Sequence, residues 1–290
     1  MKYIIWILVI SILLVILEIV RELHTFRVTH AEIQTDKLSR ESGELRIAVL
    51  SDLHNYTYGR HNRKLLDSIR REAPDLILVA GDMLVGKQGA PFTVAEEFMR
   101  EVSKIAPVYY GNGNHEQRMK EESDHYGNEY QRYREMLRNS RIRFLENESE
   151  FFRWKGEEIR VTGLEIPLSY YKKFQRQTLK SEEIDERVGD ADKSHLQILI
   201  AHNPAHGETY ARWGADIVVS GHLHGGIVRL PFLGGMMTPQ IRLFPKYSGG
   251  VYQEGKTTLV VSKGLGTHTF PIRFLNEAEV VMLHIKGRGE

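Results

Sequence analysis

Short apolar runs recur along this chain, and most of them end in a histidine, an aspartate or an asparagine. The runs "RIAVLSD" (46–52), "DLILVAGD" (75–82) and "PVYYGNGNHE" (107–116) have the length and composition of buried strands. Between them, "NRKLLDSIRREAP" (62–74) and "PFTVAEEFMREVSKIA" (91–106) have the spacing of amphipathic helices. Strands that alternate with helices predict an α/β sheet with helices on its faces.

The second half of the chain predicts a second sheet. The runs "LQILIAHNP", "DIVVSGHLHGG", "TTLVVSKG" and "EAEVVMLHI" follow one another with few helices between them. Two charged stretches, 117–140 and 170–194, interrupt the pattern, and the first has helical character. We expect both to present solvated faces, with a functional lid as the alternative.

The N-terminus begins with an almost wholly apolar run, "YIIWILVISILLVILEIV" (3–20). About 20 apolar residues cross a bilayer as a helix, so this run is just long enough. The alternatives are a buried core helix and a cleaved signal peptide, but no small-x-small cleavage site follows closely. We therefore expect an uncleaved, single-pass membrane anchor at 1–24, a partly extended linker at 25–44, and one domain at 45–290.

Composition narrows the chemistry. The chain of 290 residues has 39 Lys and Arg against 38 Asp and Glu, which argues against the basic face that nucleic-acid binding needs. It has no cysteine, so neither a thiolate nucleophile nor a Cys-ligated zinc is available. A metal site would have to use His, Asn, Asp and Glu, which suit manganese, iron or zinc.

The residues at the strand ends form a candidate metal set. In open α/β sheets, sites form beyond the carboxyl ends of strands, so groups from five strand ends would meet in one crevice. Each residue alone has a structural explanation, such as a helix cap, a turn or a hydrogen-bonded histidine, but together they predict a metal centre. The set comprises Asp52 and His54 in "SDLH", Asp82 in "GD", Asn114 and His115 in "GNHE", His202 in "AHNP", and His222 and His224 in "GHLH".

This order of motifs, D-x-H, G-D, G-N-H-[DE], a lone His and G-H-x-H, resembles the calcineurin-like metallophosphoesterase superfamily over roughly residues 46–286. It looks closest to bacterial membrane-linked members, sometimes grouped with UDP-2,3-diacylglucosamine hydrolases. The segments "AHNP", "GHLHGG" and 259–285 support that likeness. The resemblance implies a four-layer α/β/β/α sandwich of two mixed sheets.

The resemblance also implies a role for each residue of the set, in a centre of two divalent ions. One ion would be bound by Asp52, His54, Asp82 and His224. The second would be bound by Asp82, Asn114, His202 and His222, with Asp82 bridging. His115 matches the catalytic histidine, and Glu116, which stands where Asp is commoner, is expected to orient it. Ile227 stands where glutamine is frequent.

These features together predict a hydrolase of a phosphoester or pyrophosphate bond, acting through metal-activated water. Because the anchor would hold the site at a bilayer, we expect a lipid-linked substrate. The alternatives are a phosphodiesterase or nuclease of the same fold and, less favoured because every expected site residue is present, a non-catalytic metal-binding scaffold. The resemblance favours a domain on the extracytoplasmic side of the membrane, whereas the charges flanking the apolar run weakly favour the cytoplasmic side.

Three further features are expected near the substrate. His61 and His268 are candidates to border the pocket. The loop 234–246 mixes Met, Ile and Phe with Arg242 and Lys246. Such a loop is usually packed against the protein, and the alternative near a membrane is that it receives an acyl chain while the cations meet phosphate.

Overall fold

Two six-stranded sheets stacked face to face dominate the structure, a computed structural model that describes residues 1–174, 177–239, 241–267 and 271–288. The first sheet has the order β1 (Phe26–Thr35), β14 (Ala278–Gly287), β2 (Glu44–Leu50), β3 (Leu76–Ala80), β4 (Val108–Gly111), β5 (Ile142–Phe144). The second has the order β12 (Gly250–Glu254), β13 (Thr257–Val261), β9 (Ile217–Ser220), β8 (Leu196–Ala201), β7 (Glu157–Leu164), β6 (Glu148–Trp154). Both contain parallel and antiparallel pairs, as the resemblance implied. The run "EAEVVMLHI", which the sequence predicted for the second sheet, instead forms β14 in the first sheet, where it pairs with β1 and β2.

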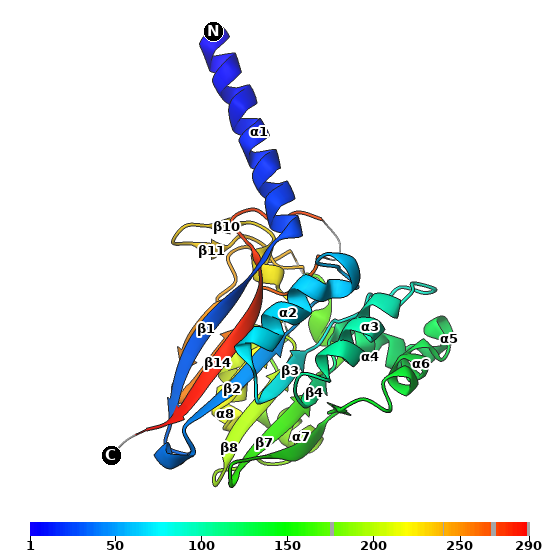
Figure 1. Cartoon of the computed structure of the whole chain (residues 1–290), viewed down its shortest axis with the longest axis vertical. Helices are drawn as coiled ribbons and strands as arrows, with labels where there is room; N and C mark the ends of the chain where they lie inside the picture. Colours follow the sequence, from blue (N-terminus) through cyan, green and yellow to red (C-terminus); the bar gives the residue numbers. More distant parts are fainter. Residues whose placement is uncertain (175–176, 240, 268–270, 289–290) are drawn as a thin grey trace.

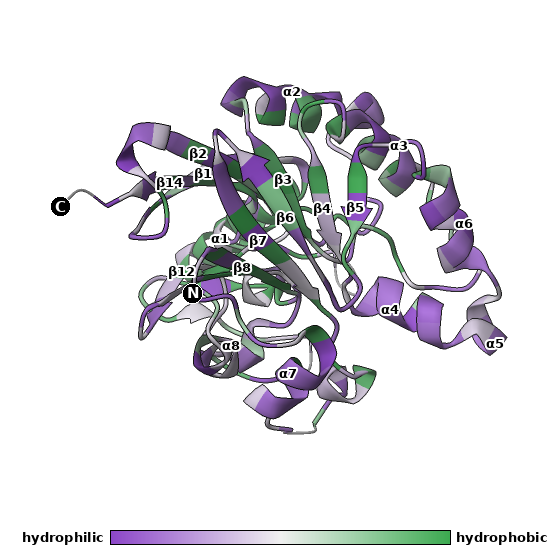
Figure 2. Ribbon diagram, turned by 90° about the horizontal axis from the view of Figure 1, so that it is seen from below, coloured by the Kyte–Doolittle hydropathy of each residue, from purple (hydrophilic) through white to green (hydrophobic). Residues whose placement is uncertain are grey.

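Helices cover the outer face of each sheet (Figure 2). On the first sheet these are α2 (Arg63–Glu72) and α3 (Thr93–Val102), and on the second α7 (Ser181–Val188) and α8 (Gly207–Trp213). Side chains of β2 alternate between two cores: Ile47 and Val49 pack between the sheets, while Ala48 and Leu50 pack under the helices. This alternation follows from the period of two in a strand buried on both faces. The predicted four-layer α/β/β/α sandwich is therefore confirmed.

The charged stretches predicted as insertions form peripheral helices. The first contains α4 (Asn114–Glu121), α5 (Ser123–Tyr126) and α6 (Glu129–Met136), which are largely hydrophilic in Figure 2. The second contains the 3₁₀ turn η3 (Leu168–Tyr171) and α7. Each still buries part of one face, through Tyr130 and Tyr133 in α6 and through Ile184 and Val188 in α7.

The stretch 25–44, which we expect to link the anchor to the domain, lies in the first sheet. Its strand β1 pairs in parallel with β14 from Phe26↔Ala278 to Thr35↔Gly287. The 3₁₀ turn η1 (Arg40–Ser42) then leads directly into β2. Polar residues such as Arg27, His30 and Glu32 concealed this strand in the sequence, but they suit a sheet edge that faces water.

The N-terminal helix α1 (Lys2–His24) projects from the domain (Figure 1). Within the described part of the chain it is the one helix long and apolar enough to cross a membrane, and its apolar length is exposed. Only its last turns pack on the domain. The buried Glu22 carboxylate accepts the Asn276 backbone N–H at 2.8 and 3.1 Å, and the Tyr56 hydroxyl donates to the Leu23 carbonyl.

Candidate metal centre

The expected metal-ligating side chains converge beyond the carboxyl ends of the strands. Three overlapping groups have ligand atoms that lie within 4.8 Å of one another: Asp52, His54 and His224; His54, Asp82 and His115; and Asp82, His202 and His222. They come from the loops after β2, β3, β4, β8 and β9. Because His54 and Asp82 each belong to two groups, the three groups form one continuous cluster.

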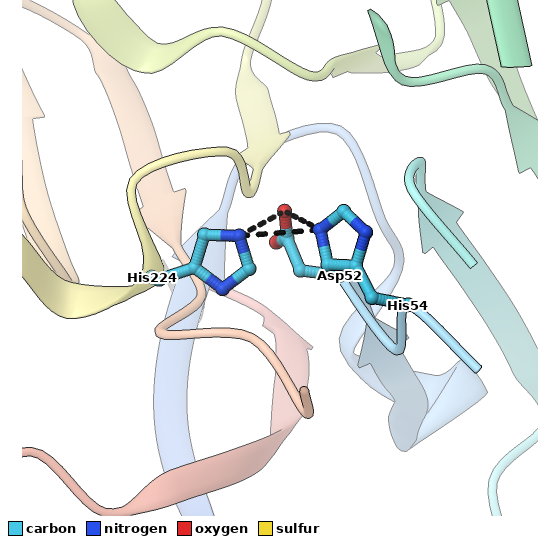
Figure 3. A group of neighbouring side chains, drawn as sticks. All are labelled: Asp52, His54 and His224. Carbon is cyan, nitrogen blue, oxygen red and sulfur yellow. Dashed lines mark hydrogen bonds and ion pairs between the residues drawn. The ribbon is translucent and has the colours of Figure 1, made fainter. Parts of the chain in front are cut away.

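One end of the cluster is drawn in Figure 3, where two imidazoles face a carboxylate. The Nε2 atoms of His54 and His224 lie 3.2 Å apart, and they lie 3.9 and 3.5 Å from Asp52 Oδ1. Asp52 is fully buried, and its carboxylate accepts the backbone N–H of His222. The H-x-H loop is thus tied directly to the D-x-H loop.

Asp82 occupies the middle of the cluster. Its Oδ2 lies 3.1 Å from His202 Nε2, 3.8 Å from His54 Nε2 and 3.9 Å from His115 Nε2. Burial raises the pKa of this carboxyl, but His202, His115 and His54 together hold it well below its usual value. Asp82 is therefore a carboxylate, and one placed to face groups on both sides.

Asn114 supplies a buried oxygen to the same region. It begins α4 and is 5% exposed, and its Oδ1 has no hydrogen-bond partner in the described part of the chain. A buried amide oxygen without a donor is costly unless a ligand or ion satisfies it. This observation fits the expected role of Asn114 as a metal ligand.

The hydrogen bonds made by Nδ1 divide the histidines into two kinds, those whose Nδ1 donates and one whose Nδ1 accepts. His202 Nδ1 donates to the Ala80 carbonyl at 2.6 Å, and His224 Nδ1 donates to the Gly266 carbonyl at 3.0 Å. Once its Nε2 is deprotonated, each of these rings presents an Nε2 lone pair to the cluster, as metal-binding histidines do. Burial lowers the pKa of His202, but the Asp82 carboxylate outweighs it and raises that pKa to about 9, so a metal ion would displace a proton from this ring. His115 is the reverse, because its Nδ1 accepts the Gly86 N–H at 2.8 Å. When this ring is neutral it carries the proton on Nε2, which suits a hydrogen-bond donor and not a ligand.

Glu116 differs from the expectation that it orients His115. Its carboxylate accepts the backbone N–H groups of Asp82, Met83 and Gly113 at 2.8–3.0 Å, and the Tyr110 hydroxyl at 2.7 Å. Burial and the charge of Asp82 raise the pKa of Glu116 to about 7. In these described contacts Glu116 braces the loop that carries Asp82, and the group that sets the His115 tautomer is the Gly86 backbone. Nothing in the sequence around Gly86 signals that contact.

The ligand loops depart from ordinary backbone geometry. Asp52, His54, Asp82, His222 and His224 have φ between 46° and 69°, in the left-handed region that non-glycine residues rarely adopt. Such conformations persist only where surrounding contacts enforce them, and they concentrate at functional sites. These five positions all belong to the cluster, although positive φ also occurs at other non-glycine residues of the described chain, such as Ala73 and Asn147.

Two buried residues that sequence reasoning missed hold these loops. Arg273 is 2% exposed, and its guanidinium donates to the carbonyls of Lys263, Gly264 and Gly266, the segment that packs on Asp52. Asn276 donates its side-chain N–H to the carbonyls of His224 and Ile227, at 2.7 and 3.2 Å. Both lie in the segment 259–285 that supports the family likeness, but nothing local indicates that their side chains bind the carbonyls of distant loops.

A cavity of about 380 Å³ adjoins the centre. Asn203 and Leu223, which line it, are chain neighbours of His202 and of the H-x-H pair, and Arg242 and Lys246 line it from the loop 234–246. His61, expected near the pocket, is instead exposed and lies 2.9 Å from Glu97. His268 lies outside the described residues.

Comparison with known proteins agrees with this geometry. A family model described as calcineurin-like phosphoesterase matches residues 45–226. The protein YpbG of Bacillus subtilis (strain 168) is 27% identical over 273 residues, covering 91% of this chain and 90% of its own length. A transmembrane protein with metallophosphoesterase domain from Danio rerio is 25% identical over 288 residues, and the match covers 96% of this chain and 62% of that protein.

Among solved structures, the phosphopantetheinyl hydrolase of Mycobacterium tuberculosis aligns with a TM-score of 0.49 and 14% identity. That alignment covers 76% of this chain and 89% of the other.

Proposed function

This chain belongs to the calcineurin-like phosphoesterase family, and from that premise we propose that it is a dinuclear metal-dependent phosphohydrolase attached to a membrane. The observation that carries the proposal is the position of Asp82 Oδ2, which faces His202 on one side and His54 on the other. From this position the Asp82 carboxylate could serve the ligand sets of two metal ions at once.

The ligands divide into two sets around Asp82. Asp52, His54 and His224 complete the first set, which Figure 3 shows, and Asn114, His202 and His222 complete the second. Imidazoles and an amide oxygen supply donors without adding negative charge that would repel phosphate. Manganese, iron and zinc all accept such ligands. When bound, two divalent ions lower the pKa of water to give a nucleophile and neutralise charge on the phosphoryl oxygens.

His115 acts beside this centre as a proton donor. Gly86 holds its Nδ1, so the Nε2–H points into the cluster, 3.9 Å from Asp82 Oδ2. From there it can donate to a phosphoryl oxygen or protonate the leaving oxygen as the bond to phosphorus breaks. Glu116 accepts the backbone N–H of Asp82 and so holds the Asp82 loop in place beside His115.

We further propose a lipid-linked phosphoester or pyrophosphate as the substrate, with the domain on the extracytoplasmic side. Helix α1 would hold the centre at a bilayer surface, and the relative from Danio rerio is itself described as a transmembrane protein. The cavity of about 380 Å³ offers room beside the centre for a substituent of the phosphate, with Arg242 and Lys246 in its wall. The near-zero net charge disfavours a nuclease.

The test is hydrolysis by full-length, detergent-solubilised protein loaded separately with manganese, iron or zinc. Phosphomonoesters, phosphodiesters, lipid pyrophosphates and single-stranded DNA would be compared. We expect Asp82→Asn to abolish nearly all turnover and to reduce bound metal, because losing the shared charge weakens both sets of ligands. His125→Ala, at an exposed histidine on α5, is the matched control and should keep both.

Two outcomes would contradict the proposal. An Asp82→Asn protein with full metal content and the wild-type rate would remove Asp82 from the centre. If the protein hydrolyses only DNA, the nuclease alternative is correct and the proposed lipid-linked substrate is wrong.

A further inference from the structure

Exposed apolar side chains gather on loops around the base of α1. Phe232 is fully exposed, Leu243 is 65% exposed and Leu275 is 46% exposed. Large apolar patches on a protein surface mark contact with a partner or a membrane. The patch, which we term the apolar collar, comprises Phe232, Leu233, Leu243, Phe244, Ile272 and Leu275.

Backbone contacts join the loops of the collar into one surface. Val228, beside the short strand β10 (Arg229–Leu230), forms a parallel bridge with Phe274. Met236 donates its N–H to the Val228 carbonyl at 2.8 Å, and Phe244 donates to the Met236 carbonyl at 2.9 Å. Three segments that are separate in the sequence are thereby held side by side.

This surface lies at the level where the apolar length of α1 ends. Asn276, next to Leu275, donates its backbone N–H to Glu22, and Arg21 lies 3.7 Å from Glu277. Figure 1 shows the loops around β10 and β11 (Gly234–Gly235) beside the lower end of α1. The exposed apolar run of α1 extends to Val20, one turn or less from these contacts.

We propose that the apolar collar is seated in the same bilayer that α1 crosses, so that the domain is held against the membrane and not merely tethered to it. This inference rests on the membrane attachment within the proposed function, and the collar continues the lipid-facing surface of the helix. Burying these side chains in the acyl-chain boundary removes their apolar area from water.

Seating the collar would also fix the metal centre relative to the membrane. A Cβ on Gly226 would lie 2.6 Å from Gly235 Cα, so the H-x-H loop packs directly on the β10–β11 loop. Asn276 binds the His224 carbonyl with its side chain and Glu22 with its backbone. The mouth of the centre would therefore open close to the headgroup layer.

The absence of cysteine makes the test direct, because a single introduced cysteine can carry a label without background. The full-length Phe232→Cys protein would be labelled with an environment-sensitive fluorophore and reconstituted into phosphatidylcholine vesicles containing a minority of phosphatidylglycerol. We expect a blue-shifted emission that is quenched by lipids carrying a nitroxide on the acyl chain and protected from aqueous iodide. Phe151→Cys, at a 46% exposed phenylalanine on the sheet-edge strand β6, is the matched control and should show the opposite pattern.

Equal iodide quenching at both positions would overturn the inference. Protection from iodide without quenching by the labelled lipid, increasing with protein density in the vesicles, would assign the collar to a second copy of the chain instead. The measurement reads depth and not turnover, so its failure is distinguishable from a failure to hydrolyse phosphate esters.

Discussion

At the scale of single residues, the tautomer of His115 favours the proposed role of proton donor over that of metal ligand. We expect His115→Ala to retain its bound metal, because Nε2 carries a proton and does not face the cluster as a lone pair. Its rate should fall by roughly 10²–10⁴, the usual contribution of a positioned acid or base. The loss should shrink for substrates with good leaving groups if protonation is the role of His115. Metal content and turnover check this, and loss of metal would contradict the assignment.

His206 makes stability depend on pH. Burial, together with the charge of Arg242, lowers the pKa of His206 from 6.5 to about 4. Between these values the unfolded chain binds the proton and the folded chain does not, so this contribution is complete above about pH 6.5 and is lost as pH falls toward 4. The slope is about 1.4 kcal/mol per pH unit.

His206→Asn provides the matched comparison for that prediction. Unfolding free energies of wild type and variant, measured by denaturant across this pH range, should converge as the pH falls. A difference that stays constant with pH would show that folding does not lower the pKa of His206.

The residues of the candidate metal cluster were predictable from sequence, whereas those that hold its loops were not. Asp52, His54, His222 and His224 stand in short motifs after apolar runs, and the structure brings them together. Arg273 and Asn276 act on backbone carbonyls that are distant in the chain, and the contact between Gly86 and His115 has no side-chain signature. Such contacts depend on tertiary packing, which no local pattern records.

At the scale of elements, the last turns of α1 belong to the domain and not to the anchor. Deleting residues 1–17 keeps Glu22 bound to Asn276, whereas deleting 1–24 removes that charge-assisted hydrogen bond. We expect the longer deletion to melt roughly 4–8 °C lower, for a loss of about 2 kcal/mol. Thermal denaturation of the two truncated chains measures the difference.

The two deletions should differ in activity as well as in stability. Asn276 also holds the His224 carbonyl, so the longer deletion should slow turnover of a small soluble ester while the shorter one leaves it unchanged. Glu22→Gln in the shorter chain keeps the side-chain shape and removes the charge, and should give an intermediate melting temperature. Identical behaviour of both truncations would show that the helix end contributes nothing to the site.

The strands β2, β3 and β4 of the first sheet were predictable because they are short and apolar, as in β3, whose five residues are all buried. Strand β14 was predicted as a strand but in the wrong sheet, because its position late in the sequence grouped it with the strands of the second sheet. Strand β1 was not. Its burial is incomplete, its sequence is polar, and its partner β14 lies at the other end of the sequence. A strand defined by such a distant pairing resembles an extended linker until the fold is known.

At the scale of the whole molecule, the metal centre should contribute to stability. Two buried carboxylates and several imidazoles from five loops meet there, and ions that bind only the folded state stabilise it. Chelation should lower the melting temperature. The expected loss in the free energy of unfolding is about 2.7 kcal/mol for an ion present at 100 times its dissociation constant. Adding back manganese, iron or zinc should restore it, and Asp82→Asn should respond least. A melting temperature that changes neither on chelation nor on the substitution Asp82→Asn would contradict a stabilising role for the ions.

The pairing of β1 with β14 has a consequence for biosynthesis. Residue 26 leaves the ribosome long before residue 278, its partner in the sheet. At about 5–20 residues per second, β1 waits on the order of tens of seconds with no neighbouring strand, because β14 is its partner in the described sheet. Its Arg27 and Glu32 are the kind of charged side chains that keep an unpaired strand from aggregating. The nascent domain can therefore complete its first sheet only when translation has nearly ended, and a ribosome stalled before β14 would leave both β1 and β2 with an unpaired edge.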